Sequence, residues 1–233
     1  HYVIRTREKD ALPLLGVDLE LPIWESDTLH IVPYVDLNSV DLRGLGLHAG
    51  LRSEIRFTPL SRLTTRLEYQ LAGEGYTDRY KSPFYEVERW SHRKGKSKLT
   101  WLREDAADSL VSARHGFSVE TEYTLSGRMN MMLSYGDTEG PANSHLLLHV
   151  SFPEFKGFRC ALTYANLGFE ELTDLIDSTG TVFGISARYQ LGDYFYVKAQ
   201  AGNEWWLNQE PGLKKEFETT FNYDIGVGAL ITL

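Results

Sequence analysis

The stretch Phe217–Leu233 reads FETTFNYDIGVGALITL, and apolar side chains occupy nearly every second position in it. One alternate set runs from Phe217 through Phe221 and Ile225 to Leu233, and the other set is mostly polar or glycine. Successive side chains of a β-strand point to opposite faces, so this pattern predicts a strand with one apolar face. Strands of globular proteins usually have about 5–6 residues, and this one is predicted to be about three times as long.

A strand of that length with one bare apolar face requires an apolar environment as wide as itself. The hydrocarbon core of a bilayer is about 30 Å thick, and a tilted strand crosses it in about 9–11 residues. The sequence therefore predicts a transmembrane β-barrel, with apolar side chains toward lipid and polar side chains toward a lumen.

The composition agrees with a barrel and disfavours several other classes of protein. Hydrophobic residues make up 42% of the 233 residues and the mean hydropathy is −0.31, as expected where only alternate residues meet lipid. No run of about 18 apolar residues is present, so no transmembrane helix is predicted. The net charge of −8 disfavours nucleic acid as a partner. The single cysteine, Cys160, excludes an internal disulfide and a cysteine-based zinc site.

Alternating segments fill most of the chain. The predicted strands, in order, are residues 15–23, 29–37, 45–57, 63–71, 84–90, 117–125, 129–135, 146–152, 158–164, 183–191, 195–201 and 217–233. Twelve strands result if residues 1–10 are not a strand and residues 97–112 form a short amphipathic helix, and fourteen result if both are strands. Pro33 predicts a bulge, because proline lacks an amide donor. The chain is predicted to be one barrel domain, residues 1–233, with an irregular or helical insertion around residues 73–112.

Tight turns and long loops alternate over the second half of the chain. The tight turns are expected near residues 126–128, 153–157 and 192–194, and the long loops near 137–143, 168–179 and 208–214. This pattern resembles bacterial outer-membrane β-barrel proteins as a class, of the porin-like kind, which have short turns inside and long loops outside. The resemblance implies an all-β, antiparallel up-and-down barrel in the outer membrane of a Gram-negative bacterium. Members of that class usually end on an aromatic residue, and Leu233 stands in that place here.

A soluble β-sandwich or a lipocalin-like barrel would also show alternation. The predicted strand lengths weigh against it, as do the charges on the polar face, which would fill the interior of a small soluble barrel. The apolar face would also leave a very large exposed patch. The two interpretations differ in where four side chains point. Leu51, Val197, Phe221 and Ile225 face lipid in a membrane barrel and converge on a dry core in a soluble fold.

The densest set of charges lies on the hairpin formed by residues 45–57 and 63–71. The candidate lumen-lining residues are His48, Arg52, Glu54, Arg56, Arg66 and Glu68, with Arg62 in the same cluster. A three-residue loop, 59–61, predicts Arg52 opposite Glu68 and Glu54 opposite Arg66, so that opposite charges pair across the hairpin. Two interpretations stay open: a charged wall that filters solutes, or ion pairs that only hold neighbouring strands together.

The pattern favours a channel or export pore that passes small solutes through a charged lumen. One alternative is a structural or anchoring subunit of a larger outer-membrane secretion, motility or polysaccharide-export machine. Another is a lipid hydrolase, because outer-membrane lipid hydrolases use a His-x-Ser pair like His149 and Ser151, in which the histidine deprotonates the serine. No catalytic residue, metal site or cofactor is predicted. The expected partners are membrane lipid, lipopolysaccharide and proteins of an outer-membrane complex.

Overall fold

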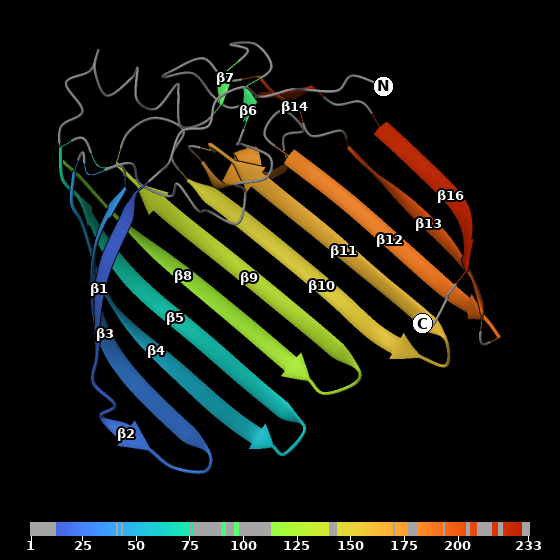
Figure 1. The fold of residues 1–233 in the computed structure, drawn as a ribbon, viewed down its shortest axis with the longest axis horizontal. Helices are drawn as coiled ribbons and strands as arrows, with labels where there is room; N and C mark the ends of the chain where they lie inside the picture. Colours follow the sequence, from blue (N-terminus) through green and yellow to red (C-terminus); the bar gives the residue numbers. More distant parts are fainter. Residues whose placement is uncertain are drawn as a thin grey trace.

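The computed structural model consists of antiparallel β-strands that follow one another across a curved sheet (Figure 1). It describes residues 13–40, 42, 44–74, 76, 90–91, 96–97, 113–139, 144–169, 171–176, 181–192, 194–203, 206–208, 216–218 and 221–229. The strands of the main sheet are β1 (Leu14–Glu20), β2 (Trp24–Glu25), β3 (Leu29–Val40), β4 (Gly46–Thr58), β5 (Ser61–Ala72), β8 (Arg114–Leu125), β9 (Met129–Thr138), β10 (His145–Phe155), β11 (Phe158–Leu167), β12 (Thr181–Leu191), β13 (Phe195–Asn203) and β16 (Phe221–Ala229).

Among the described residues, five short elements lie outside the main sheet. Strand β6 (Trp90–Ser91) pairs with β7 (Lys96–Ser97), and β14 (Trp206–Asn208) pairs with β15 (Glu216–Glu218). A 3₁₀ helix, η1 (Leu172–Ile176), lies in the acidic loop predicted near residues 168–179. Within the described ranges, no helix has the length and apolar content needed to span a membrane.

The main sheet has twelve strands in the order β1-β3-β4-β5-β8-β9-β10-β11-β12-β13-β16, with β2 paired to β3. Each strand is antiparallel to its neighbours, which confirms the predicted all-β, up-and-down architecture of about twelve strands. The membership differs from the prediction, because the two-residue β2 is one of the twelve. The predicted strand 84–90 lies outside the described residues except for Trp90, which belongs to β6.

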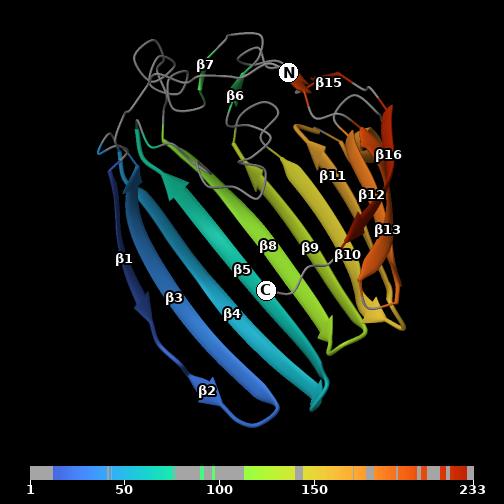
Figure 2. The same cartoon turned by 45° about the vertical axis from the view of Figure 1, so that its right-hand side comes forward.

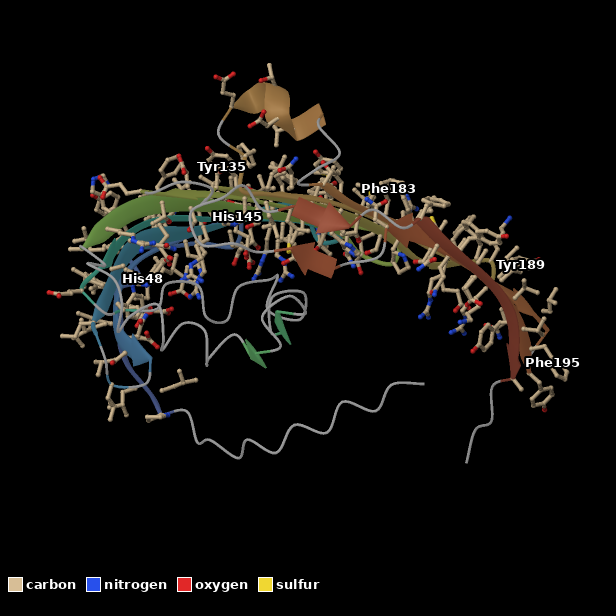
Figure 3. All side chains as sticks on the ribbon, turned by 90° about the horizontal axis from the view of Figure 1, so that it is seen from above. His48, Tyr135, His145, Phe183, Tyr189 and Phe195 are labelled. Carbon is tan, nitrogen blue, oxygen red and sulfur yellow. The ribbon has the colours of Figure 1, made fainter. Side chains whose placement is uncertain are left out.

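The sheet curves strongly into a convex and a concave face (Figures 2 and 3). Tyr135 and Phe183 lie on the convex side, and His48 and His145 lie on the concave side (Figure 3). The pairing register places the exposed apolar set on the convex side as well. That set includes Leu51, Leu67, Phe117, Leu133, Ile185, Phe221, Ile225 and Val227. Val197 shares that face and is partly buried.

The convex face is therefore apolar and open to its surroundings. Phe221 is 62% exposed and Ile225 is 74% exposed, so these side chains do not converge on a dry core. The described apolar cluster is small and consists of Leu147, Ala165, Leu167 and Val182 with Met132 packed against it. A soluble sandwich would place its long apolar sets inside, so this arrangement favours the membrane interpretation.

Tight turns join the strands at one end of the sheet, the tight-turn end. Strands β10 and β11 meet at Lys156 and Gly157, both with positive φ (50° and 80°), as a two-residue type I′ hairpin requires. Strand β10 extends to Phe155, so this turn is shorter than the predicted 153–157. The turns at 126–128 and 192–194 are confirmed, each with a glycine at φ 68°. The connections at the opposite end are longer, and we call it the long-loop end.

The predicted strand 217–233 is divided in the structure. Glu216–Glu218 forms β15 and pairs with β14 outside the main sheet, whereas Phe221–Ala229 forms β16 and pairs with β13. The prediction of one continuous strand was wrong, because period-two alternation shows which face a residue takes but not which partner the strand pairs with.

The predicted bulge at Pro33 was also wrong in its position. Pro33 lies in an unbroken ladder opposite Leu51 on β4. The irregularity falls on the other neighbour, where β1 ends at Glu20 and β2 begins at Trp24 with a one-residue change of register. The Pro33 carbonyl accepts the Leu21 amide at 3.0 Å, so its missing amide donor also faces this interruption. The proline disturbs its partner strand rather than its own.

Several predictions concern residues that the structure does not describe. Of the predicted helix 97–112, only Ser97 is described, and it lies in β7. Residues 1–10 and most of the predicted insertion 73–112 are outside the described ranges. The single-domain assignment of residues 1–233 stays a prediction.

The two faces of the sheet predict opposite responses to a new charge. We expect Ile225→Arg, on the convex face of β16, to destabilise the folded barrel by about 2–4 kcal/mol, because an arginine near the bilayer midplane must leave water. The control is Gln200→Arg on the concave face of β13, directly across from Asp224, which should fold normally. Urea unfolding in lipid vesicles, followed by heat-modifiable gel mobility, measures both. Equal losses for the two variants would contradict the assignment of faces.

Candidate functional site

The six predicted lumen-lining residues lie on the concave face of two neighbouring strands. His48, Arg52, Glu54 and Arg56 occupy alternate positions of β4, and Arg66 and Glu68 occupy alternate positions of β5. Figure 3 shows His48 inside the curve of the sheet. The structure thus brings together the residues that the alternation placed on one face. We call the concave face of β3, β4 and β5 the polar wall.

The predicted register of this hairpin was wrong by two residues. Arg52 lies opposite Arg66 rather than Glu68, and Glu54 lies opposite Thr64. Strands β4 and β5 are joined by a two-residue loop, 59–60, and the register shifts between Arg56 and Thr58. A bulge inserts one extra residue into a strand, so loop length alone did not determine the pairing. The opposed Arg52 and Arg66 each contact a carboxylate, that of Glu20 on β1 and that of Glu68 on β5 respectively.

Glu68 is the centre of the polar wall. Its carboxylate accepts hydrogen bonds from the Tyr34 hydroxyl (2.5 Å), the Arg66 guanidinium (2.5 Å) and the Gln70 amide (2.6 Å). The Nδ1 atom of His48 lies 2.9 Å from Oε1, the oxygen that also accepts from Gln70, whereas Tyr34 and Arg66 donate to Oε2. The Glu68 side chain is only 5% exposed. A buried carboxylate is tolerated when it is paired and its lone pairs are satisfied, and these four partners meet that requirement.

A glycine allows Tyr34 to reach Glu68 across an intervening strand. Tyr34, Gly50 and Glu68 form one row across β3, β4 and β5. A Cβ atom at Gly50 would lie 2.5 Å from the Tyr34 ring and from the Leu67 carbonyl oxygen, so the ring occupies the space above the glycine. The Tyr34 hydroxyl also accepts a hydrogen bond from Arg66 Nε at 2.6 Å. A side chain on β4 would block both contacts.

The same ring-over-glycine arrangement recurs on the concave face. The Tyr76 ring covers Gly46, and its hydroxyl donates to Asn38 on β3. The His145 ring covers Gly136. The Tyr196 ring covers Gly228 on β16. Sequence reasoning missed this set, although single glycines in alternating strands signal close approach of another group.

The arginines of the polar wall have a different environment from Glu68. Arg52 spans β3 to contact Glu20 of β1 at 3.1 Å. Glu54 contacts Arg56 at 2.7 Å and Arg62 at 3.8 Å. The side chains of Arg52, Arg56, Arg62 and Arg66 are all between 46% and 61% exposed. The exposed pair of Arg52 and Glu20 contributes about 0–1 kcal/mol to stability, whereas the pair of Arg66 with Glu68 is buried on the carboxylate side. All four guanidinium groups are accessible to solvent.

The histidine of the candidate catalytic pair, His149 and Ser151, contacts a neutral hydroxyl group rather than a carboxylate. The Nδ1 atom of His149 lies 2.9 Å from the Thr163 hydroxyl on β11. His149 and Ser151 share one face of β10, but among the described residues no carboxylate contacts His149. Among the residues that the structure describes, no group of three histidine, cysteine or acidic side chains is placed to hold a metal ion.

Comparisons with known proteins give little further information. No family model matches the sequence, and no curated protein is similar to it. Among solved structures, "LpxR from Salmonella typhimurium" aligns with 94% of this chain and 88% of its own at 10% identity and a TM-score of 0.34. A superposition at that TM-score supports no inference about this chain.

The ring-over-glycine contact predicts a steric effect of a single methyl group. Gly50→Ala should cost about 1–3 kcal/mol of unfolding free energy, because Tyr34 or the Leu67 backbone must move. Gly184→Ala is the matched control, since it lies on the same concave face and a Cβ atom there meets nothing within 4 Å. Equilibrium unfolding in urea, followed by tryptophan fluorescence, compares them. Similar stability of both variants would contradict the proposed role of Gly50.

Because Glu68 is buried, we expect its substitution to lower the free energy of unfolding strongly. Glu68→Ala should lose about 3–5 kcal/mol, because it leaves Arg66 without its buried partner and Tyr34, Gln70 and His48 without their acceptor. Glu20→Ala removes a carboxylate that is 49% exposed and should lose no more than about 1 kcal/mol. The same unfolding experiment tests both. A small effect at Glu68 would show that the network is not needed for folding.

Proposed function

We propose that the chain is a bacterial outer-membrane β-barrel that passes small solutes through a charged lumen. The observation that carries the proposal is the division of the sheet into an exposed apolar convex face and a charged concave face. Water inside and lipid outside account for both faces, and the reverse arrangement accounts for neither.

Exposed aromatic residues on the convex face support the membrane assignment. Phe57 and Phe195 lie near the tight-turn end, and Tyr69 and Tyr223 lie near the long-loop end. The pairing register separates each pair by about six to eight residues, or about 20–27 Å along the strands at roughly 3.4 Å per residue. Outer-membrane barrels carry aromatic girdles at both edges of an apolar band about 25 Å tall. Membrane lipid and lipopolysaccharide are the partners that this proposal entails.

The charges of the polar wall support the proposal that the lumen selects solutes by their charge. Arginines outnumber glutamates on the concave face of the β4–β5 hairpin, and Arg52 lies directly opposite Arg66 in the pairing register. A ring of basic side chains favours anions over cations in a pore. Because these groups are half exposed, they remain available to a solute that passes the wall.

Planar-bilayer recordings test the channel. The double variant Arg52→Ala, Arg66→Ala should raise cation permeability relative to anion permeability several-fold, because it removes the opposed positive charges. Arg128→Ala is the matched control, since Arg128 is an exposed arginine in the turn between β8 and β9 and is not part of the concave face of β3, β4 and β5.

An unchanged permeability ratio in the double variant would contradict the filter. The absence of any conductance by the folded wild-type barrel would contradict the channel itself and favour an anchoring subunit. Lipid-ester turnover that Ser151→Ala abolishes would instead favour the hydrolase alternative.

A further inference from the structure

A second group of basic side chains lies on the concave face, well separated along the sheet from the polar wall. Arg159 of β11 lies directly opposite Arg188 of β12, and Arg188 lies directly opposite Lys198 of β13. We call these three residues the basic row. Strands β11 to β13 and strands β3 to β5 form opposite sides of the curved sheet (Figures 2 and 3), so the basic row and the polar wall line different parts of the concave face.

The pairing register places the basic row on this face and near one end of the sheet. Phe183 lies on the convex side of β12 (Figure 3), and Arg188 is an odd number of residues away, so it takes the concave side. Arg159 is the second residue of β11, directly after the turn at Lys156 and Gly157. The basic row therefore lies near the tight-turn end of the concave face.

Three like charges in one row work against the fold. The Cβ atoms of directly opposite residues are about 4.5–5.5 Å apart, and like charges in such positions are destabilising. Arg159 contacts Glu154 at 3.2 Å, and Lys198 contacts Asp224 at 2.8 Å. Arg188 lies between them, and among the described residues no carboxylate contacts it. Three positive and two negative charges leave an excess of one, centred on Arg188.

The polar wall differs from the basic row in this respect. Arg52 and Arg66 also lie directly opposite each other, but Arg52 contacts Glu20 and Arg66 contacts Glu68. Ion pairs that hold neighbouring strands together therefore account for these two arginines. They do not account for Arg188, whose charge adds to the repulsion within its row.

A tyrosine ring orients the Arg188 guanidinium group. The central carbon of this group lies 4.4 Å from the centroid of the Tyr196 ring, which stands diagonally across on β13. The Tyr196 ring itself occupies the space above Gly228 of β16. A guanidinium group stacked on an aromatic face keeps its in-plane N–H donors available, and their fork matches two oxygens of a carboxylate or phosphate. The donor group is thus oriented in advance, which lowers the entropic cost of binding.

We propose that Arg188 is the centre of a binding site for an oxyanion, that is, for a phosphate or carboxylate group of a small solute. The guanidinium fork takes two oxygens of that group, and Arg159 and Lys198 attract it from either side. A halide ion has no pair of oxygens for the fork and gains only from the charge. The site rests on the proposed function, because a solute reaches the concave face only if that face lines a water-filled lumen.

Titration calorimetry with inorganic phosphate tests the site on the folded barrel in detergent. We expect the wild type to bind phosphate, with and without excess potassium chloride, and Arg188→Gln to bind it at least about tenfold more weakly, because the substitution removes the fork and the excess charge. Arg128→Gln is the matched control and should bind like the wild type, since Arg128 is an exposed arginine in the turn between β8 and β9. Arg188→Lys keeps the charge without the fork and should lose affinity severalfold, so it replaces Arg188→Gln if that variant lacks heat-modifiable mobility.

Three outcomes would overturn the proposal. The first is no phosphate binding by a wild-type barrel that retains heat-modifiable mobility. The second is equal affinity of the wild type and the folded Arg188 variants, which would place the binding elsewhere. The third is loss of phosphate binding in excess chloride, which would show a general attraction for anions. Calorimetry requires no conductance, so a barrel that binds phosphate but passes no current contradicts the channel alone, and one that conducts without binding phosphate contradicts this site alone.

Discussion

The structure depends on one constraint: a backbone that crosses hydrocarbon must satisfy its hydrogen bonds with itself. An antiparallel sheet does so from strand to strand, and its alternating side chains then separate the two environments. On this sheet the separation is nearly complete, since Ile225 and Phe221 are exposed on the convex face while Glu68 is buried on the concave face.

The concave face combines two kinds of charge that differ in what they contribute to the fold. Glu68 is buried and has four partners from three strands, so it ties β3, β4 and β5 together. The arginines around it are half exposed and paired in water. Burial raises the cost of losing a partner, whereas exposure screens the pair. Glu68 is therefore expected to contribute more to stability than the half-exposed pair of Arg52 and Glu20.

Period-two alternation predicted most strands and the face of each candidate residue, because the side-chain direction follows directly from the position along a strand. It did not predict the register of the β4–β5 hairpin, since the bulge between Arg56 and Thr58 adds a residue that no loop length reveals. The Glu68 network could not be predicted for the same reason. The row Tyr34–Gly50–Glu68 exists only in the observed register. The reason for a glycine at position 50 becomes apparent only once the Tyr34 ring is known to lie over it.

The glycines on the concave face explain how a curved wall accommodates large side chains. Curvature brings inward-pointing groups of adjacent strands closer together, so a ring needs an empty position beside it. Gly50, Gly136 and Gly228 each provide that space for an aromatic or imidazole ring from the neighbouring strand. The ring then spans the strand that carries the glycine, and in the case of Tyr34 it links strands that share no backbone hydrogen bonds. Such links stiffen the sheet across the strands, in the direction in which a barrel closes.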